Sequence, residues 1–271
     1  MLNSVNMLQM SSLQVVQLSD THLFSIADKE LLGLTTFDSF QRVLETLHQL
    51  QPKPDILLLT GDLSQDETQL SYERLRDSVE SLSVPAYWLP GNHDQPALME
   101  QILDGGWLSA QKAFQQGGWN FVLLNSMTPG QVYGELSAES LQWLEQQLAH
   151  LPQQPTLIAL HHPPCSIGSN WMDRINLQNS SAFFEMIDRY KQVKLVLFGH
   201  IHQEFDHVRA GVRYLGCPST CVQFKPNQAN FAVDQKSPGF RVLTLYPDGH
   251  YTTLIKRIPY EPQPNMDAVG Y

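Results

Sequence analysis

The feature that most constrains the fold is an alternation of short apolar runs with segments of helical periodicity. Three runs, Leu13–Ser19, Asp55–Thr60 and Pro85–Leu89, are short and mostly apolar, as buried strands of a parallel sheet are. Between them, apolar residues recur at helical spacing from Phe37 to Leu50 and from Leu75 to Leu82. The first part of the chain therefore predicts a βαβαβ unit.

The alternation continues through the middle of the chain. The apolar runs Trp119–Asn125, Thr156–Leu160 and Val193–Phe198 predict three further strands. Helical patterns cover Ser137–His150 and Ser181–Tyr190. This half repeats the strand and helix order of the first, without an internal sequence repeat.

In the last part of the chain, the sequence pattern changes to an alternation with a period of two residues, as in β-strands. From Glu204 onward, turn signals at Ala210-Gly211 and Asp248-Gly249 predict hairpins. The whole pattern predicts an α/β fold in which two mixed β-sheets pack together with helices outside. The proline-containing tail Pro259–Tyr271 predicts an extended or mobile arm, and whether it folds over a cleft is open.

Charge and composition exclude several classes of partner. The net charge is −10, from 27 acidic and 17 basic residues, which argues against a nucleic-acid backbone as the main partner. An acidic protein also repels a phosphate substrate unless local positive charge, such as bound metal, overrides that field. No apolar run suits a membrane span and Met1–Ser12 lacks a secretory pattern, so we predict a cytoplasmic protein without a membrane partner. Reduced thiols are expected at all three cysteines, Cys165, Cys217 and Cys221.

Polar residues follow five of the predicted strands at their carboxyl ends. They are Asp20, His22, Asp62, Asn92, His93, Asp94, His161, His162, His200 and His202. In open α/β sheets this edge carries the ligand site. Residues i and i+2 of an extended segment point the same way, so Asp20 and His22 are expected to converge on one ion.

Mixed imidazole and carboxylate donors favour first-row metals, and two such ions together can clamp a phosphoryl group. Asp62, isolated after a glycine, is the natural bridging ligand, and the Asn92 amide adds no negative charge. Each motif alone has a structural alternative, such as a hydrogen-bonded pair or a turn residue. Five of them at strand ends predict a binuclear metal site.

These motifs resemble the calcineurin-like metallophosphoesterase superfamily, whose Asp-x-His, Gly-Asp, Gly-Asn-His-Asp, His-His and Gly-His-x-His pattern is complete from Asp20 to His202. Within it the chain resembles the bacterial class III cyclic-AMP phosphodiesterases. The segments that carry this closer likeness are LSDTHLF, LTGDLSQD, LPGNHD, FGHIHQE and STCVQFKP, together with SNWMDRINLQN at 169–179. The resemblance implies a four-layer sandwich, with residues 1–258 as the catalytic domain and 259–271 as the tail. One departure is His-His-Pro-Pro, where a run of three histidines is expected; the loss falls before His161.

The resemblance also implies the roles of individual residues. It assigns one ion to Asp20, His22, Asp62 and His202, and the second to Asp62, Asn92, His161 and His200. His93 matches the catalytic histidine, which is not a ligand. Iron and manganese are the favoured metals, and such shells also accept zinc.

The expected reaction is hydrolysis of 3′,5′-cyclic AMP to 5′-AMP by in-line attack of a metal-bridging hydroxide, with His93 as general acid. The expected substrate-binding residues are His22, Asp62, Asn92, His93, His162, His202, Trp171 and Phe224. Trp171 and Phe224 are expected to stack on the purine or to be ordinary core or lid aromatics. Asn179, Thr220 and Gln223 are further candidate polar contacts.

Two other functions remain open at this level. The first is a broader metallophosphoesterase acting on other nucleotide or glycerol phosphodiesters and monoesters, since one fold hosts many substrates. The second is a non-catalytic interaction module that has lost its metals, which the complete set of ligand positions disfavours. The sequence leaves the oligomeric state, monomer or homodimer, undecided.

Overall fold

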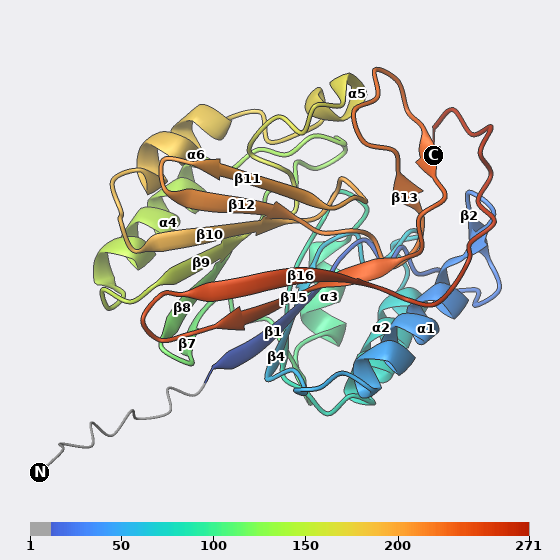
Figure 1. Cartoon of the computed structure of the whole chain (residues 1–271), viewed down its shortest axis with the longest axis horizontal. Helices are drawn as coiled ribbons and strands as arrows, with labels where there is room; N and C mark the ends of the chain where they lie inside the picture. The colour runs from blue at the N-terminus through green and yellow to red at the C-terminus, as the bar shows by residue number, and fades with distance from the viewer. Residues whose placement is uncertain (1–11, 271) are drawn as a thin grey trace, which may run out of the picture.

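Two six-stranded mixed sheets form the centre of the molecule (Figure 1). The computed structural model describes residues 12–270. The sheet orders are β16-β15-β1-β4-β5-β6 and β11-β12-β10-β9-β8-β7. The strands of these sheets are β1 (Leu13–Leu18), β4 (Ile56–Thr60), β5 (Ala86–Leu89), β6 (Leu108–Ser109), β7 (Ala113–Gln116), β8 (Trp119–Leu123), β9 (Thr156–Ala159), β10 (Val193–Phe198), β11 (Phe205–Arg209), β12 (Val212–Gly216), β15 (Gly239–Leu245) and β16 (Tyr251–Arg257).

Helices and two small hairpins complete the fold. The helices are α1 (Thr36–His48), α2 (Gln69–Glu80), α3 (Pro96–Ile102), α4 (Ala138–His150), α5 (Asn170–Asp173) and α6 (Ser180–Ile187). The small hairpins are β2 (Glu30–Leu31) with β3 (Leu34–Thr35), and β13 (Gln223–Phe224) with β14 (Val233–Asp234). Within residues 12–270, no helix has both the length and the apolarity needed to cross a membrane.

Three apolar clusters separate four layers. The inner cluster lies between the sheets and contains Val15 of β1 and Phe121 of β8. The next residue of β1, Val16, belongs instead to the cluster beneath α1 and α2. A third cluster packs Ile158 of β9 against Leu144 of α4. Neighbouring residues of one strand thus face different layers, which confirms the predicted two-sheet sandwich with helices outside (Figure 1).

Most predicted elements are confirmed to within a few residues. The parallel order β1-β4-β5 joins the first three predicted strands, and β8-β9-β10 joins the next three. The hairpins β11–β12 and β15–β16 turn at the two predicted signals. The sequence did not predict α3, α5 or the short hairpins, because they carry few periodic apolar residues. All three cysteines are free, as expected.

Candidate metal centre and active site

Five turns meet at the carboxyl edge of the two sheets. They follow β1, β4 and β5 in one sheet and β9 and β10 in the other. Backbone bonds hold the first two turns together: the N–H of Asp20 donates to the Gly61 carbonyl at 3.0 Å, and that of His22 to the Asp62 carbonyl at 2.9 Å. The strand ends therefore bring together side chains that are distant in sequence.

One group of donors consists of Asp20, His22 and His202, all buried. The Nε2 atoms of His22 and His202 lie 3.1 Å apart, although the residues are separated by 180 positions. Asp20 Oδ1 lies 3.4 Å from His202 Nε2. Asp62 Oδ2 lies 3.8 Å from His22 Nε2 on one side and 3.2 Å from His161 Nε2 on the other. Asp62 thus stands between two donor groups, where a bridging carboxylate belongs.

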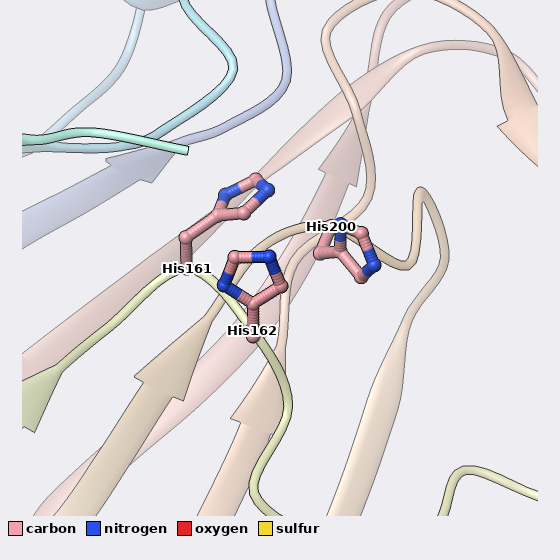
Figure 2. Close-up of side chains that lie close together, drawn as sticks. All are labelled: His161, His162 and His200. Atoms are coloured by element: carbon pink, nitrogen blue, oxygen red, sulfur yellow. The ribbon is translucent and has the colours of Figure 1, made fainter. Parts of the chain in front are cut away.

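The second group is built from histidine rings. Figure 2 shows His161 and His162, from the turn after β9, close to His200 from the turn after β10. Their ring centroids lie 4.9 Å (His161–His162), 5.1 Å (His161–His200) and 4.7 Å (His162–His200) apart. This grouping admits His162 as a metal ligand, a role the sequence did not assign to it.

The donor atoms fit metal ions because several are buried without a hydrogen-bond partner in the described part of the chain. They are Asp62 Oδ2, Asn92 Oδ1, His161 Nε2, His162 Nε2 and both ring nitrogens of His200. Burying such atoms unpaired is costly, so their concentration at one place needs a compensating ligand. A pair of cations coordinated by these oxygen and nitrogen atoms would supply it.

In His161, His162 and His202, the ring nitrogen Nδ1 contacts another group of the protein. His161 Nδ1 lies 2.9 Å from the Thr60 carbonyl, and His202 Nδ1 lies 2.8 Å from the Val222 carbonyl. Since a carbonyl only accepts, both Nδ1 atoms donate to their carbonyls. Both Nε2 atoms therefore face the centre, where they would coordinate a metal ion once unprotonated. His162 Nδ1 lies 2.8 Å from Ser126 Oγ, and this hydroxyl oxygen also accepts the His162 backbone N–H at 3.2 Å.

The backbone at the ligands differs from the expected extended conformation. Asp20, His22, Asp62, His200 and His202 all have left-handed φ angles, between 46° and 68°. Non-glycine residues rarely adopt this region, and it recurs at functional sites where the surrounding structure enforces it. The donor atoms of Asp20 and His22 do lie close together, but left-handed turns bring them there and the expected extended conformation is wrong.

Gly61 allows two of these turns to approach closely. Its φ is +88°, and a Cβ there would lie 2.5 Å from His161 Nδ1 and 2.7 Å from the Gly91 amide nitrogen. Only glycine fits this point without moving the ligand ring. The Gly-Asp motif is thus explained by close backbone approach beside Asp62.

Electrostatics at the site favour cations. Although burial alone raises the pKa of Asp62, His161 and His93 hold that pKa well below its ordinary value. Burial lowers the pKa of His161, but the carboxylates of Asp62 and Asp20 raise it to about 9. Carboxylates that attract a proton to His161 also attract a metal ion, which therefore displaces that proton on binding. Burial, and then the nearby His162 and His161, lower the pKa of His200 well below its ordinary value, which keeps it neutral.

His93 and Gln65 form a contact that the sequence did not reveal. Gln65 Oε1 lies 2.6 Å from His22 Nδ1, and Gln65 Nε2 lies 3.4 Å from His93 Nδ1. The amide oxygen therefore accepts a hydrogen bond from the ring N–H of His22, and the amide nitrogen donates one to His93 Nδ1. In the neutral His93 ring this leaves the proton on Nε2. Gln65 lies in the LTGDLSQD segment, whose likeness to the phosphodiesterases was the one signal available.

Asp94 connects two of the turns. Its buried carboxylate accepts the backbone N–H groups of Leu63, Ser64 and Gly91 at 2.9 to 3.1 Å. It also accepts the hydroxyl of Tyr72 at 3.1 Å, and that hydroxyl accepts the Gln95 N–H at 2.7 Å. Asp94 therefore fixes the loop that carries Asn92 and His93.

Tyr72→Phe tests this support without touching a ligand. Removing the hydroxyl leaves the buried Asp94 and the Gln95 N–H each short of a partner, so the free energy of unfolding is expected to fall by about 1–3 kcal/mol. Chemical denaturation measures it, with Tyr133→Phe, on a half-buried tyrosine elsewhere, as the control. Equal unfolding free energies for the two variants would contradict the role of this bond.

A cavity of about 280 Å³ opens onto the centre. Asn92, His93 and His200 line it on one side and Trp171 on the other, so it brings together four predicted site residues. Phe224 does not line it: this ring is buried, 4.1 Å from the His202 ring and stacked on it at an interplanar angle of 7°. Phe224 is therefore a core aromatic, which was the second of the two expectations for it, and it packs against the ring of His202.

The further polar candidates bond to the protein itself. Asn179 donates to the Leu136 carbonyl and accepts its N–H, at 2.7 and 3.0 Å. Gln223 donates to the Ser219 and Cys221 carbonyls at 2.8 and 3.0 Å. Both side chains brace loops, whereas the buried Thr220 hydroxyl has no hydrogen-bond partner among residues 12–270.

Two solved structures superpose on most of this chain. A dimetal phosphatase from Danio rerio superposes with a TM-score of 0.63 at 14% identity, covering 91% of this chain and 99% of the other. GAP50, described as the anchor in the inner membrane complex of Plasmodium, superposes with a TM-score of 0.64 at 12% identity, covering 95% and 90%. At such identities the likeness shows the fold alone.

Sequence comparison places the chain more narrowly. The chain is 53% identical over 248 residues to a 3′,5′-cyclic-nucleotide phosphodiesterase of Nostoc sp., covering 92% of this chain and 93% of the relative. It is 41% identical over 260 residues to the 3′,5′-cyclic adenosine monophosphate phosphodiesterase of Escherichia coli K12, covering 95% and 94%. The profile of the family described as calcineurin-like phosphoesterase matches residues 13–204, which contain every proposed ligand turn. With its fold, its paired donor groups and these relatives in agreement, the chain belongs to the calcineurin-like phosphoesterases.

Proposed function

We propose that the chain hydrolyses 3′,5′-cyclic AMP to 5′-AMP with a pair of transition-metal ions. The observation that carries the proposal is the position of Asp62 between two buried donor groups, beside His93 and a cavity with an aromatic wall. The relatives named as cyclic-nucleotide phosphodiesterases support the substrate.

The donor groups suggest how the ions are held. One set consists of Asp20, His22, Asp62 and His202, and the other of Asp62, Asn92, His161 and His200. Iron and manganese are the proposed metals, with zinc as an alternative for such mixed shells. When bound, the two cations lower the pKa of a water molecule and stabilise negative charge on the phosphoryl oxygens.

The residues of the chain supply orientation and a proton. Hydrolysis breaks the bond between phosphorus and the 3′-oxygen, and the water oxygen takes its place on phosphorus. The departing 3′-oxygen needs a proton, and His93 Nε2 carries one because Gln65 faces Nδ1. The backbone N–H of His93 donates to Asp62 Oδ1 at 2.8 Å, which fixes His93 beside the bridging carboxylate. We include His22, Asp62, Asn92, His162 and His202 among the residues that contact the phosphate.

A comparison of substrates tests the proposal. Protein loaded with manganese or iron is expected to hydrolyse cyclic AMP with a kcat/KM at least about tenfold above that for a phosphodiester lacking a nucleoside, since the base adds binding energy. Chelated protein is expected to lose turnover and regain it when metal is added back. Turnover of cyclic AMP no better than that of simple phosphoesters would leave the broader phosphoesterase as the function.

We also propose residues 1–258 as the catalytic domain and 259–271 as a tail. The absence of a nucleic-acid partner and a cytoplasmic location stay predictions, as does a monomeric or homodimeric state. The non-catalytic alternative is disfavoured because all seven ligand positions and His93 carry donor side chains.

A further inference from the structure

We propose that the end of the tail, residues 265–270, is a strap that holds the nucleoside part of the substrate over the metal site. This inference rests on the proposed function, since it assigns a wall of the cavity to the base and sugar of a cyclic nucleotide. Val269 and Gly270 line the same 280 Å³ cavity as Asn92, His93 and His200. The last described residues of the chain thus share a cavity with the residues proposed to act on the phosphate.

The cavity has a polar end and an apolar end. Beyond the histidines its walls are Trp171, Ile175 and Phe231, and the Trp171 and Phe231 ring centroids lie 5.1 Å apart in an edge-to-face arrangement. The Trp171 indole N–H is buried and has no hydrogen-bond partner in the part of the chain that the structure describes. An aromatic face beside an unused donor suits a flat heteroaromatic base, which offers both a π-face and acceptor nitrogens.

Two exposed valines complete the rim. Val269 is 93% exposed and Val132 is 52% exposed, and both line the cavity. Apolar side chains at the mouth of a binding cavity gain free energy when a ligand covers them. A nucleoside has the extra surface that could cover these valines, whereas a small phosphoester lacks it.

The strap is anchored on the β2–β3 turn, and Figure 1 shows the tail running past β2 after it leaves β16. The Asn265 N–H donates to the Leu32 carbonyl at 2.7 Å. Gly33 adopts a φ of +81°, and a Cβ there would lie 3.1 Å from the Asn265 nitrogen and 3.4 Å from the Gln263 carbonyl. A side chain at Gly33 therefore crowds the backbone of the strap at its anchor, which has to shift, and the positive φ adds strain of its own.

The segment before the strap is fixed as well. The Tyr260 carbonyl accepts the Ser237 hydroxyl at 2.5 Å, and the Arg42 guanidinium lies 4.9 Å from the Tyr260 ring centroid. After the anchor, Ala268 packs against the apolar cluster outside the second sheet. With contacts at Tyr260, Asn265 and Ala268, the position of Val269 is set by the fold.

The decisive variants displace the strap without changing the metal site. They are a chain ending at Pro264 and Gly33→Ala, with Gly211→Ala as the matched control. Gly211 has nearly the same φ, +82°, but nothing within 4 Å of its Cβ position, so it carries the backbone strain alone. Within the strap, Val269→Ala is compared with Met266→Ala, which is exposed but does not line this cavity.

Two substrates separate the strap from the chemistry: cyclic AMP, and methyl 4-nitrophenyl phosphate, a diester without a nucleoside. Both displacing variants are expected to raise KM for cyclic AMP about tenfold and to keep kcat/KM for the small diester within about twofold. Metal content per chain is expected to stay unchanged. Gly211→Ala and Met266→Ala are expected to behave as the unaltered chain.

Amide hydrogen exchange provides a readout that does not depend on turnover. In the full chain, saturating 5′-AMP is expected to slow exchange in residues 265–270, and less so in Gly33→Ala. Three results would contradict the role proposed for the strap. They are equal losses of kcat/KM on both substrates in the displacing variants, an unchanged KM for cyclic AMP, and amide exchange in residues 265–270 that 5′-AMP does not slow. If the full chain showed no preference for cyclic AMP over the small diester, the proposed function itself would be wrong. If that preference remained after residues 265–271 were removed, only the role proposed for the strap would be wrong.

Discussion

His93→Ala is expected to lower kcat for cyclic AMP by about 10²–10⁴, the usual contribution of a positioned general acid. The side chain faces the cavity and, with Gln65 opposite Nδ1, holds a proton on Nε2 for the departing 3′-oxygen. The loss is expected to depend on the leaving group, because an activated nitrophenolate needs less help from an acid. Parallel measurements on cyclic AMP and a nitrophenyl diester test this difference.

The metal content of His93→Ala is expected to equal that of the unaltered chain. The contact between His93 and Asp62 is made by the backbone N–H, at 2.8 Å, and alanine preserves it. His207→Ala, on an exposed histidine of β11, is the matched control and is expected to keep full activity. Wild-type turnover in His93→Ala would show that the proton comes from another group.

Asp62→Asn is expected to reduce bound metal to less than one ion per chain and to lower kcat/KM by about 10³ or more, since each ion contributes several kcal/mol to the transition state. The amide keeps an oxygen that can accept the His93 N–H, so the loop survives. It removes the negative charge that faces His22 on one side and His161 on the other. Two ions then lose their shared ligand together.

Asp66→Asn is the control for Asp62→Asn because it changes a carboxylate in the same loop. Asp66 accepts the Ser25 N–H and hydroxyl, both at 2.8 Å, and stands outside the donor groups. It is expected to keep two ions and most of the activity. Two ions retained in Asp62→Asn would show that this carboxylate is not the bridge.

The edge of the sheets that carries the site could be predicted from the sequence. The apolar run of β4 ends abruptly at Gly61 and Asp62, and the run of β10 ends at Gly199 and His200, so the position of these polar residues followed from strand ends. Carboxyl ends of parallel strands share one edge of their sheet. Because β4 and β10 belong to different sheets, the packing of the two sheets against each other brings these two turns together.

The conformation of the ligands could not be predicted in the same way. Asp20 and His22 converge through left-handed backbone that is imposed by bonds to the Gly61 and Asp62 carbonyls. Contacts of this kind join residues about forty positions apart or more, such as Ser25 to Asp66 at 41, and local propensity does not record them.

The surroundings of the site were the least predictable part. Gln65 is an unremarkable polar residue until the fold places it between His22 and His93. Phe224 carried the right chemistry for stacking on a base, but tertiary packing placed it behind His202. Trp171 and Phe231 become neighbours only because α5 and the loop between β13 and β14 meet.

Metal analysis of the active protein, by mass spectrometry on protein purified without chelator, tests the central claim most directly. We predict two transition-metal ions per chain at full activity, with turnover rising from zero as chelated protein is titrated back to that content. Full turnover in protein that contains no transition metal would contradict the whole account of this site.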